Sequence, residues 1–272
     1  MARVSRPRIL TVAGSDSGGG AGIQADLKTF AALGAYGTSA ITAVTAQNTL
    51  GVTDVLEVHP ATVRAQIDAV MDDIGADAAK TGMLSSAEII EEVANGLRRH
   101  GVSRLVVDPV MVATSGARLL RKDAEEALIR LLIPAASLVT PNVQEATVLV
   151  GRPIETIDQV REAAREIAGM GARAVVITGG LEDGPATDVL FAGGEIEIFA
   201  AERIETLSTH GTGCTFSAAA AVGLARGMRT RDAVATAKRY VAAAIRGAYP
   251  VGSGHGPVDH FHGLVGIGSG QQ

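Results

Sequence analysis

Residues 210–227 read HGTGCTFSAAAAVGLARG, two glycines around a threonine followed by an alanine-rich run. Gly211 and Gly213 allow the backbone to turn tightly at Thr212, and the alanine run predicts a helix that begins there. The first N–H groups of a helix lack partners within it and, with the helix dipole, favour an anion such as a phosphate. The alternative is an ordinary tight turn into a core helix, and this segment alone does not decide between the two.

The same helix start contains Cys214, the only cysteine of the chain. We expect the positive end of the helix dipole to lower the pKa of its thiol. A single cysteine also excludes a disulfide within the chain, which is typical of a protein of the reducing cytoplasm.

Length and composition favour one large α/β domain over residues 1–272. The chain is 47% hydrophobic, and no Pro/Ser-rich linker or block of charge divides it. The net charge of -5, three Tyr, five Phe and no Trp leave neither a basic face nor a stacking platform, so we expect no nucleic-acid partner. No apolar run is long enough for a membrane helix, and the basic N-terminus leads into a strand pattern rather than a signal peptide.

Short apolar strands alternate with amphipathic helices along most of the chain. Strands are expected at residues 8–14, 37–44, 52–58, 77–81, 104–108, 138–140 and 174–178, and helices between them, for example at 60–74, 85–99 and 157–170. This alternation predicts a mostly parallel sheet with helices on both faces. Segments 187–192 and 195–199, joined by two glycines, predict one antiparallel hairpin beside the phosphate region.

Several polar side chains fall where open α/β sheets bind ligands, outside the carboxyl ends of the strands. The Gln47 carboxamide can pair with an amino group and the adjacent nitrogen of a heterocycle, or it satisfies loop backbone groups. Asp26 borders the buried stripe of a helix and either points towards the ligand or is an ordinary polar helix residue. Asn142 and Glu145 have the spacing of a capping box, which is compatible with a ligand site as well.

The chain closely resembles the hydroxymethylpyrimidine and phosphomethylpyrimidine kinases of thiamine biosynthesis, members of the ribokinase-like superfamily. The resemblance rests on six motifs, which follow in the order AGSDSGGGAGIQADLKTF, TAVTAQNTLGV, KTGML, VVDPVM, TPNVQEA and HGTGCTFSAA. It implies a three-layer αβα sandwich around a central, mostly parallel sheet. It also implies that ATP, with Mg²⁺, phosphorylates 4-amino-5-hydroxymethyl-2-methylpyrimidine and then the resulting monophosphate.

The resemblance also implies roles for individual residues on the acceptor side. Gln47 would read the aminopyrimidine edge, and the pocket would be lined by Gly14, Asp26, Met83 and Val110. Gly211 and Gly213 would form an anion hole. Cys214, which stands where sugar kinases of the superfamily carry an Asp, would take the proton of the substrate hydroxyl.

On the nucleotide side, the residues implied to approach ATP are Asn142, Glu145, Thr178, Thr212 and Lys238, with Glu145 and Asp108 near Mg²⁺. Better-known members of the family carry a Lys at the position of Thr178. Threonine cannot supply that charge, which leaves open the detailed ATP contacts and the efficiency of the second phosphorylation.

Two other functions remain open from the sequence. A pyridoxal kinase of the same superfamily would act on a similar hydroxymethyl heteroaromatic ring, although Gln47 and the full set of motifs favour the pyrimidine. A catalytically silent sensor of the pyrimidine or nucleotide belongs to a different class of protein. The resemblance also implies a homodimer.

Overall fold

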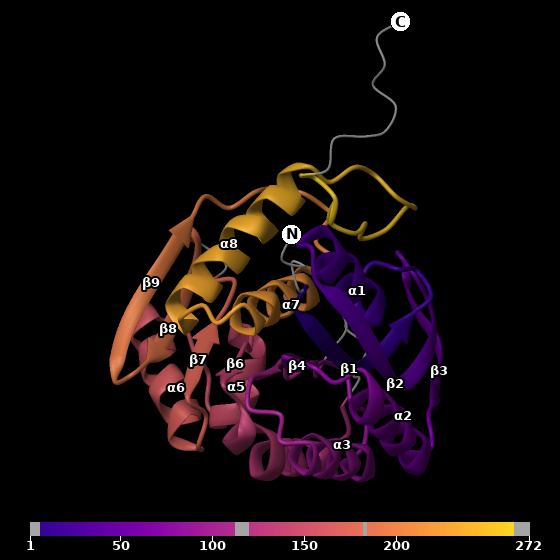
Figure 1. Cartoon of the computed structure of the whole chain (residues 1–272). Helices are drawn as coiled ribbons and strands as arrows, with labels where there is room; N and C mark the ends of the chain where they lie inside the picture. The colour runs from indigo at the N-terminus through magenta and orange to yellow at the C-terminus, as the bar shows by residue number, and fades with distance from the viewer. Residues whose placement is uncertain (1–5, 112–119, 182–183, 264–272) are drawn as a thin grey trace, which may run out of the picture.

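The computed structural model describes residues 6–111, 120–181 and 184–263 (Figure 1). Its strands are β1 (Arg8–Asp16), β2 (Tyr36–Asn48), β3 (Gly51–Glu57), β4 (Ala78–Thr81), β5 (Leu105–Val107), β6 (Leu138–Val139), β7 (Ala174–Ile177), β8 (Ala186–Ala192) and β9 (Glu195–Ala201). Its helices are α1 (Gly22–Ala32), α2 (Pro60–Asp73), α3 (Ala87–Arg99), α4 (Lys122–Ala127), α5 (Val143–Val150), α6 (Ile157–Gly169), α7 (Thr212–Ala225) and α8 (Thr230–Arg246).

The strands form one nine-stranded sheet in the order β3-β2-β1-β4-β5-β6-β7-β8-β9. From β2 through β7 in this order the strands are parallel, and β8 and β9 form the expected antiparallel hairpin. The expectation of only one antiparallel piece is wrong, because β2 turns after Asn48 and returns as antiparallel β3. β2 is also longer than expected, so Gln47 lies within the strand.

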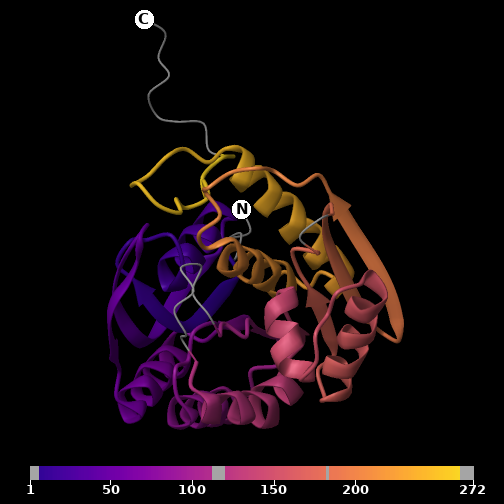
Figure 2. The same ribbon diagram turned by 180° about the vertical axis from the view of Figure 1, so that it is seen from behind.

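The buried strands send alternate side chains to two separate cores. In β5, Leu105 and Val107 pack with apolar residues of α2, α3, α5 and α6, whereas Val106 packs with α1, α7 and α8. Figures 1 and 2 show these two layers of helices on opposite sides of the sheet. Burial on both faces explains the continuous apolar pattern of these strands and confirms the αβα sandwich.

A helical segment after residue 121 was not among the expected elements. α4 continues through a π-helical turn, Leu128–Leu132, into a short 3-10 turn, Ile133–Ala135. Leu128, Leu132 and Ile133 are buried in the core on the side of α3. Their packing holds the segment in a helix although its hydrogen-bonding pattern changes along it.

α7 is the expected alanine-rich helix, and it is buried on all sides. Every residue from Thr215 to Leu224 is buried, between the sheet and α8. Among the helices in the described ranges, none combines the length and apolarity needed to cross a membrane.

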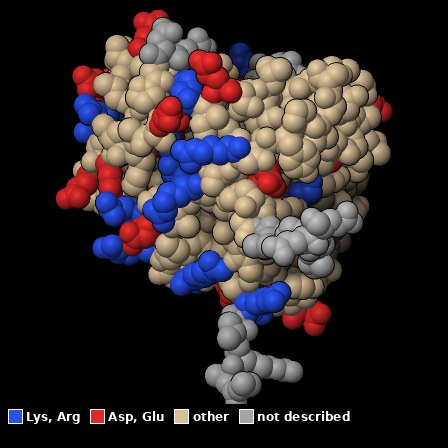
Figure 3. All heavy atoms as spheres, turned by 90° about the horizontal axis from the view of Figure 1, so that it is seen from above, with Lys and Arg blue, Asp and Glu red and all other residues tan. Residues whose placement is uncertain are grey.

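α8 covers α7 with its apolar side and carries charge on its other side. Figure 3 shows Lys and Arg gathered with Asp and Glu on one half of the face seen from above, while the other half is mostly uncharged. Arg231 of α8 lies 2.6 Å from the carboxylate of Glu197 in β9. Such exposed pairs contribute little to stability, so the apolar side of α8, with Ala233, Val234 and Val241, holds it in place.

Candidate active site

The carboxyl ends of the parallel strands face one cavity. Because parallel strands end at the same edge of a sheet, this edge collects side chains from distant parts of the chain. The cavity is lined by residues at or after six strands, including Asp16, Gln47, Lys80, Asp108, Asn142 and Thr178. The start of α7, from His210 to Cys214, lines it as well.

The start of α7 depends on a glycine in the left-handed conformation. Gly211 is the N-cap, with a φ of 78°, and a Cβ there would lie 1.8 Å from the carbonyl oxygen of Gly20. Any other residue would collide with the glycine loop at residues 18–21. Among the described residues no side chain caps α7, and its first turn, Thr212 to Cys214, lines the cavity, with the N–H of Thr212 bonded to the carbonyl of Thr209.

A second cavity meets the first at the same helix start. Thr178, Thr209, Thr212 and Gly213 line both cavities. The second is otherwise bounded by β8, the segment after β9 and α8, and its walls include the side chains of Phe216, Val241, Ile245, Asp188 and Lys238. The start of α7 therefore lies where a group could pass from a ligand in one cavity to a ligand in the other.

The structure brings most of the expected site residues together. The first cavity is lined by Gly14, Gln47, Met83, Asp108, Val110, Asn142, Glu145, Thr178, Gly211, Thr212, Gly213 and Cys214. Lys238 lines the second cavity, where its ammonium lies 2.9 Å from Asp188 Oδ1 and donates to the carbonyl of Ala186. Asp26 is fully buried and is not among the residues that line either cavity.

Asp26 instead binds Lys80, a residue that the sequence reasoning did not single out. Both carboxylate oxygens of Asp26 lie 3.0 Å from Lys80 Nζ, and Thr11 donates to the same carboxylate. Burial opposes the charge of Lys80, but the neighbouring acidic groups, first Asp26 and then others such as Asp108, together outweigh it and raise the lysine's pKa. Lys80 is fully buried and lines the first cavity, so it places a fixed positive charge there. A lysine within the buried strand AAKT was the signal that could have found it.

The expectation of an acidic thiol at Cys214 is wrong. The side chain is half-buried at the cavity wall, and burial raises the pKa of the thiol to about 12. The nearby Lys80 lowers this pKa and Asp108 raises it. Loss of water around the sulfur therefore outweighs the helix dipole.

Asn142 and Glu145 form the capping box that their spacing predicted. The backbone N–H of Asn142 donates to Glu145 Oε2 at 2.9 Å, and the backbone N–H of Glu145 donates to Asn142 Oδ1 at 2.9 Å. Both residues also line the first cavity, so the structural role does not remove Glu145 from the site. Burial, together with the charge of Asp108, raises the pKa of Glu145 to about 8.

Carboxyl groups in this position fit a divalent cation that also binds phosphate. Asp108 accepts a hydrogen bond from Ser217 and lies 3.9 Å from Lys80, and burial raises its pKa. Within the described ranges, no group of three or more His, Cys, Asp or Glu side chains is arranged to hold a metal alone. Two carboxyls with phosphate oxygens and water match the usual surroundings of protein-bound Mg²⁺.

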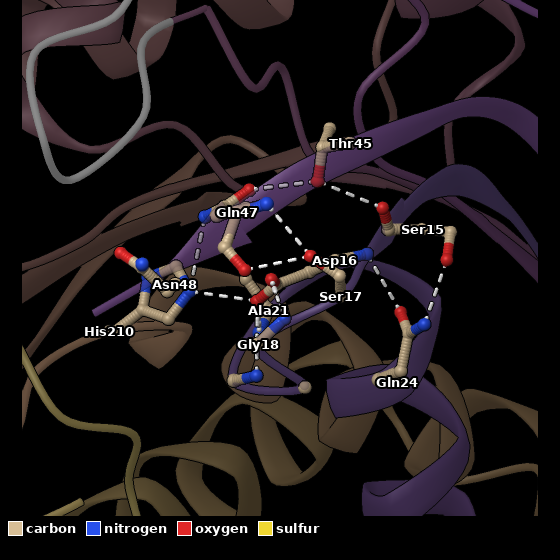
Figure 4. A network of polar contacts seen from close by, with 12 residues as sticks. Ser15, Asp16, Ser17, Gly18, Ala21, Gln24, Thr45, Gln47, Asn48 and His210 are labelled. Carbon is tan, nitrogen blue, oxygen red and sulfur yellow. Dashed lines mark hydrogen bonds and ion pairs between the residues drawn. The ribbon is translucent and has the colours of Figure 1, made fainter. Parts of the chain in front are cut away.

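Asp16 joins the glycine loop to the helix start, as Figure 4 shows. Its carboxylate accepts from the backbone N–H groups of Gly18, Gly20 and Ala21 and lies 2.9 Å from His210 Nε2. Burial opposes the charge of Asp16, but the bonds from His210 and the backbone outweigh it and lower its pKa. Sequence reasoning missed both Asp16 and His210, because residues 194 positions apart share no local pattern.

The comparisons with known proteins agree with this geometry. A family model described as phosphomethylpyrimidine kinase matches residues 16–259. The chain belongs to the phosphomethylpyrimidine kinase family. It is 54% identical to the hydroxymethylpyrimidine/phosphomethylpyrimidine kinase of Rhizobium meliloti, over 93% of this chain and 96% of that protein.

Two further relatives extend the comparison. The chain is 53% identical to the thiamine biosynthesis bifunctional protein ThiED of Geobacter sulfurreducens over 94% of its length, but it spans only 52% of that longer protein. The fold is similar to the crystal structure of an ADP complex of Bacillus subtilis pyridoxal kinase, with a TM-score of 0.88 and 42% identity. That match covers 94% of this chain and 98% of the other. The ribokinase-like fold expected from the sequence is confirmed.

The buried pair of Lys80 and Asp26 leads to a stability prediction. Asp26→Asn should lower the free energy of unfolding by about 3–5 kcal/mol, because it removes the charged group that contacts the buried ammonium. The double variant Lys80→Met/Asp26→Asn should lose less than the sum of the two single variants. Urea unfolding measures all three. Asp77→Asn, which breaks a surface pair with Arg8, is the matched control and should cost less than about 1 kcal/mol. An Asp26→Asn variant as stable as the unchanged protein would contradict the structural role.

Proposed function

We propose that this protein transfers the γ-phosphate of ATP to 4-amino-5-hydroxymethyl-2-methylpyrimidine, and that a second ATP then phosphorylates the monophosphate. The observation that carries the proposal is the start of α7, which no side chain of the described residues caps, between two cavities, one of which is lined by Gln47. An anion-binding helix start at this junction suits the phosphoryl group in transfer. The family relationship supports the same reaction.

The acceptor pyrimidine is proposed to lie in the first cavity. Gln47 offers a carbonyl oxygen and an N–H on one edge, which match the amino group and adjacent ring nitrogen of the pyrimidine. Gly14, Met83 and Val110 line the same cavity and would contact the ring. Asp26 would act on this pocket indirectly, since it holds Lys80 in place.

The nucleotide is proposed to occupy the second cavity, with its phosphates directed towards the helix start. Thr178 and Thr212 line both cavities, and Lys238 lines the second. Asn142, Glu145 and Asp108 lie at the first cavity and would face the terminal phosphate. The carboxyls of Glu145 and Asp108 would hold Mg²⁺, which neutralises phosphate charge during the transfer.

Phosphoryl transfer is mostly a matter of position and charge, and the helix start supplies both. The N–H groups at Gly211, Gly213 and Cys214 would stabilise the charge on the transferred group. Cys214 is proposed to accept the proton of the substrate hydroxyl. Because burial raises the pKa of the thiol to about 12, the thiolate is a minor species in the free protein, favoured by Lys80.

Pyridoxal phosphorylation is the second candidate function. It is supported by the similarity to the pyridoxal kinase structure, at 42% identity over 94% of this chain. We also propose that the protein is located in the cytoplasm, that it forms a homodimer, and that residues 1–272 fold as a single domain. A non-catalytic sensor would bind the same ligands without turnover.

An ATP-consumption assay with the aminopyrimidine and with pyridoxal, run in parallel, tests the function. We expect turnover with the aminopyrimidine and a higher kcat/KM than with pyridoxal. Gln47→Leu should raise the KM for the aminopyrimidine by roughly 5- to 150-fold and leave the KM for ATP unchanged, since a buried polar edge loses its partner. Binding of the aminopyrimidine and ATP without turnover would favour the sensor. An unchanged pyrimidine KM would remove Gln47 from the pocket.

Cys214 gives a prediction with a pH dependence. A thiol with a pKa of about 12 should be alkylated more slowly at pH 7 than a free cysteine, and the rate should still rise at pH 10. Cys214→Ala should bind both ligands and lose about 10²–10⁴-fold in single-turnover rate. The rate should increase with pH from 7 to 9 in the unchanged protein, as the thiolate fraction grows, and much less in the variant. A variant that keeps the original rate and pH profile would exclude Cys214 as the base.

Glu145→Gln separates metal binding from capping. Gln is accepted at the third position of a capping box, so the variant should unfold at the same urea concentration as the unchanged protein. If the carboxylate helps to hold Mg²⁺, the Mg²⁺ concentration for half-maximal activity should rise by about tenfold or more. Mg²⁺ titration of the purified variant measures this. An identical Mg²⁺ response would leave Glu145 with the capping role alone.

A further inference from the structure

The carboxamide of Gln47 is held at both ends by groups that do not belong to the ligand. Its Nε2 lies 3.3 Å from His210 Nε2, and its Oε1 lies 3.1 Å from Thr45 Oγ1 (Figure 4). The backbone of Gln47 is clamped as well, since Ser17 Oγ donates to its carbonyl and accepts from its N–H, both at 2.7 Å. The side chain that would read the acceptor is therefore fixed before any ligand arrives.

Asp16 determines that the ring nitrogen of His210 nearest to this amide carries a hydrogen. His210 Nε2 lies 2.9 Å from Asp16 Oδ2, and the bonds that Asp16 accepts keep its pKa low and the group ionised. A carboxylate only accepts hydrogen bonds, so His210 Nε2 carries a hydrogen whether the ring is neutral or charged. With the amide nitrogen towards His210, two N–H groups would face each other with no acceptor between them.

A half-turn of the amide exchanges its oxygen and nitrogen and removes this conflict. The N–H of His210 is then shared between Asp16 Oδ2 and the amide oxygen of Gln47. At the other end, the amide nitrogen donates to Thr45 Oγ1, and the Thr45 hydroxyl donates to the carbonyl of Ser15 at 3.0 Å. Without the half-turn, the single hydroxyl hydrogen of Thr45 would have to serve both the Ser15 carbonyl and the amide oxygen.

We infer that Asp16 and His210 fix the Gln47 amide with its oxygen towards the start of α7 and its nitrogen towards Thr45, and that this orientation selects the acceptor. The inference rests on the proposed function. Asp16 and His210 act here as positioning residues, through Gln47.

The orientation favours a ring in which an amino group neighbours the carbon that bears the hydroxymethyl group. The amide oxygen accepts from that amino group, and the remaining amide N–H donates to the adjacent ring nitrogen. His210 immediately precedes Gly211, so the amino group bound at the oxygen end directs the neighbouring hydroxymethyl group to Gly211 and Cys214. In the 4-oxo analogue a carbonyl replaces the amino group and an N–H replaces the ring nitrogen. The amide oxygen would then face another oxygen, and the amide N–H would face another N–H.

His210 is the residue at which to test this, because Asp16 also holds the glycine loop together. The variants are His210→Ala, which removes the N–H, and His210→Gln, whose amide restores a donor at a similar reach. Thr45→Val loosens the other end of the amide with little change of shape. His260→Ala is the matched control, because His260 is also buried and bonds Thr215 of α7 but does not line the cavity.

The measurement is kcat/KM for the 4-amino substrate and for its 4-oxo analogue, with the KM for ATP alongside. His210→Ala should reduce the preference for the amino compound by about tenfold or more, mainly through KM, because the amide can then turn. Thr45→Val should reduce the preference several-fold. His210→Gln should restore most of the preference, and His260→Ala should leave it unchanged.

Equal losses for both compounds in His210→Ala and Thr45→Val, or a failure of His210→Gln to restore the preference, would overturn the inference. If His210→Ala does not fold, Thr45→Val and His210→Gln carry the test. Absence of turnover with the aminopyrimidine in the unchanged protein would count against the proposed function alone. In that case calorimetric dissociation constants of the two compounds, in the same variants, still measure the orientation.

Discussion

The carboxylate of Asp16 is the contact on which the site depends. It gathers three backbone N–H groups of the glycine loop at the end of β1 and reaches His210 at the start of α7. The loop then packs so closely against the helix that Gly211 has no room for a Cβ. The buried carboxylate of Asp16 thus joins the end of β1 to the start of α7, and the first cavity lies beside this junction.

The cavity holds buried carboxyl groups whose ionised forms a bound cation would stabilise. Lys80 and the buried carboxyl groups of Asp26, Asp108 and Glu145 lie at or beneath the same strand ends. Burial raises the pKa of Asp108 and Glu145, so the free protein resists the ionised forms that a cation would favour. Binding of a cation with phosphates would relieve this resistance, which links the two ligands energetically.

Much of the fold and of the candidate site was predictable from the sequence, because it depends on the pattern of neighbouring residues. Strands such as β5 are apolar throughout since both faces are covered, and Asn142 and Glu145 have the spacing of a cap. Most site residues follow strands and meet for that reason alone.

The features that the sequence did not predict depend on burial or on residues far apart in the chain. The helix-start position of Cys214 predicted an acidic thiol, but burial determined its pKa. The sequence left open whether Asp26 faces the ligand, because its partner in the structure, Lys80, lies 54 positions away. A strand was expected at residues 52–58, but its antiparallel pairing with β2 was missed, because this strand is largely exposed and carries a weak apolar pattern.

The small side chains of α7 have a consequence for the position of the site. Ala218 to Ala221 are all buried against the sheet and α8, and the separation of packed layers depends on the side chains between them. Alanine lets this helix approach the sheet more closely than leucine or phenylalanine would. The distance from the strand ends to the first turn of the helix is therefore set by residues that touch no ligand. A larger side chain on this face would move the first turn of the helix outward, with every residue that lines the cavities still present.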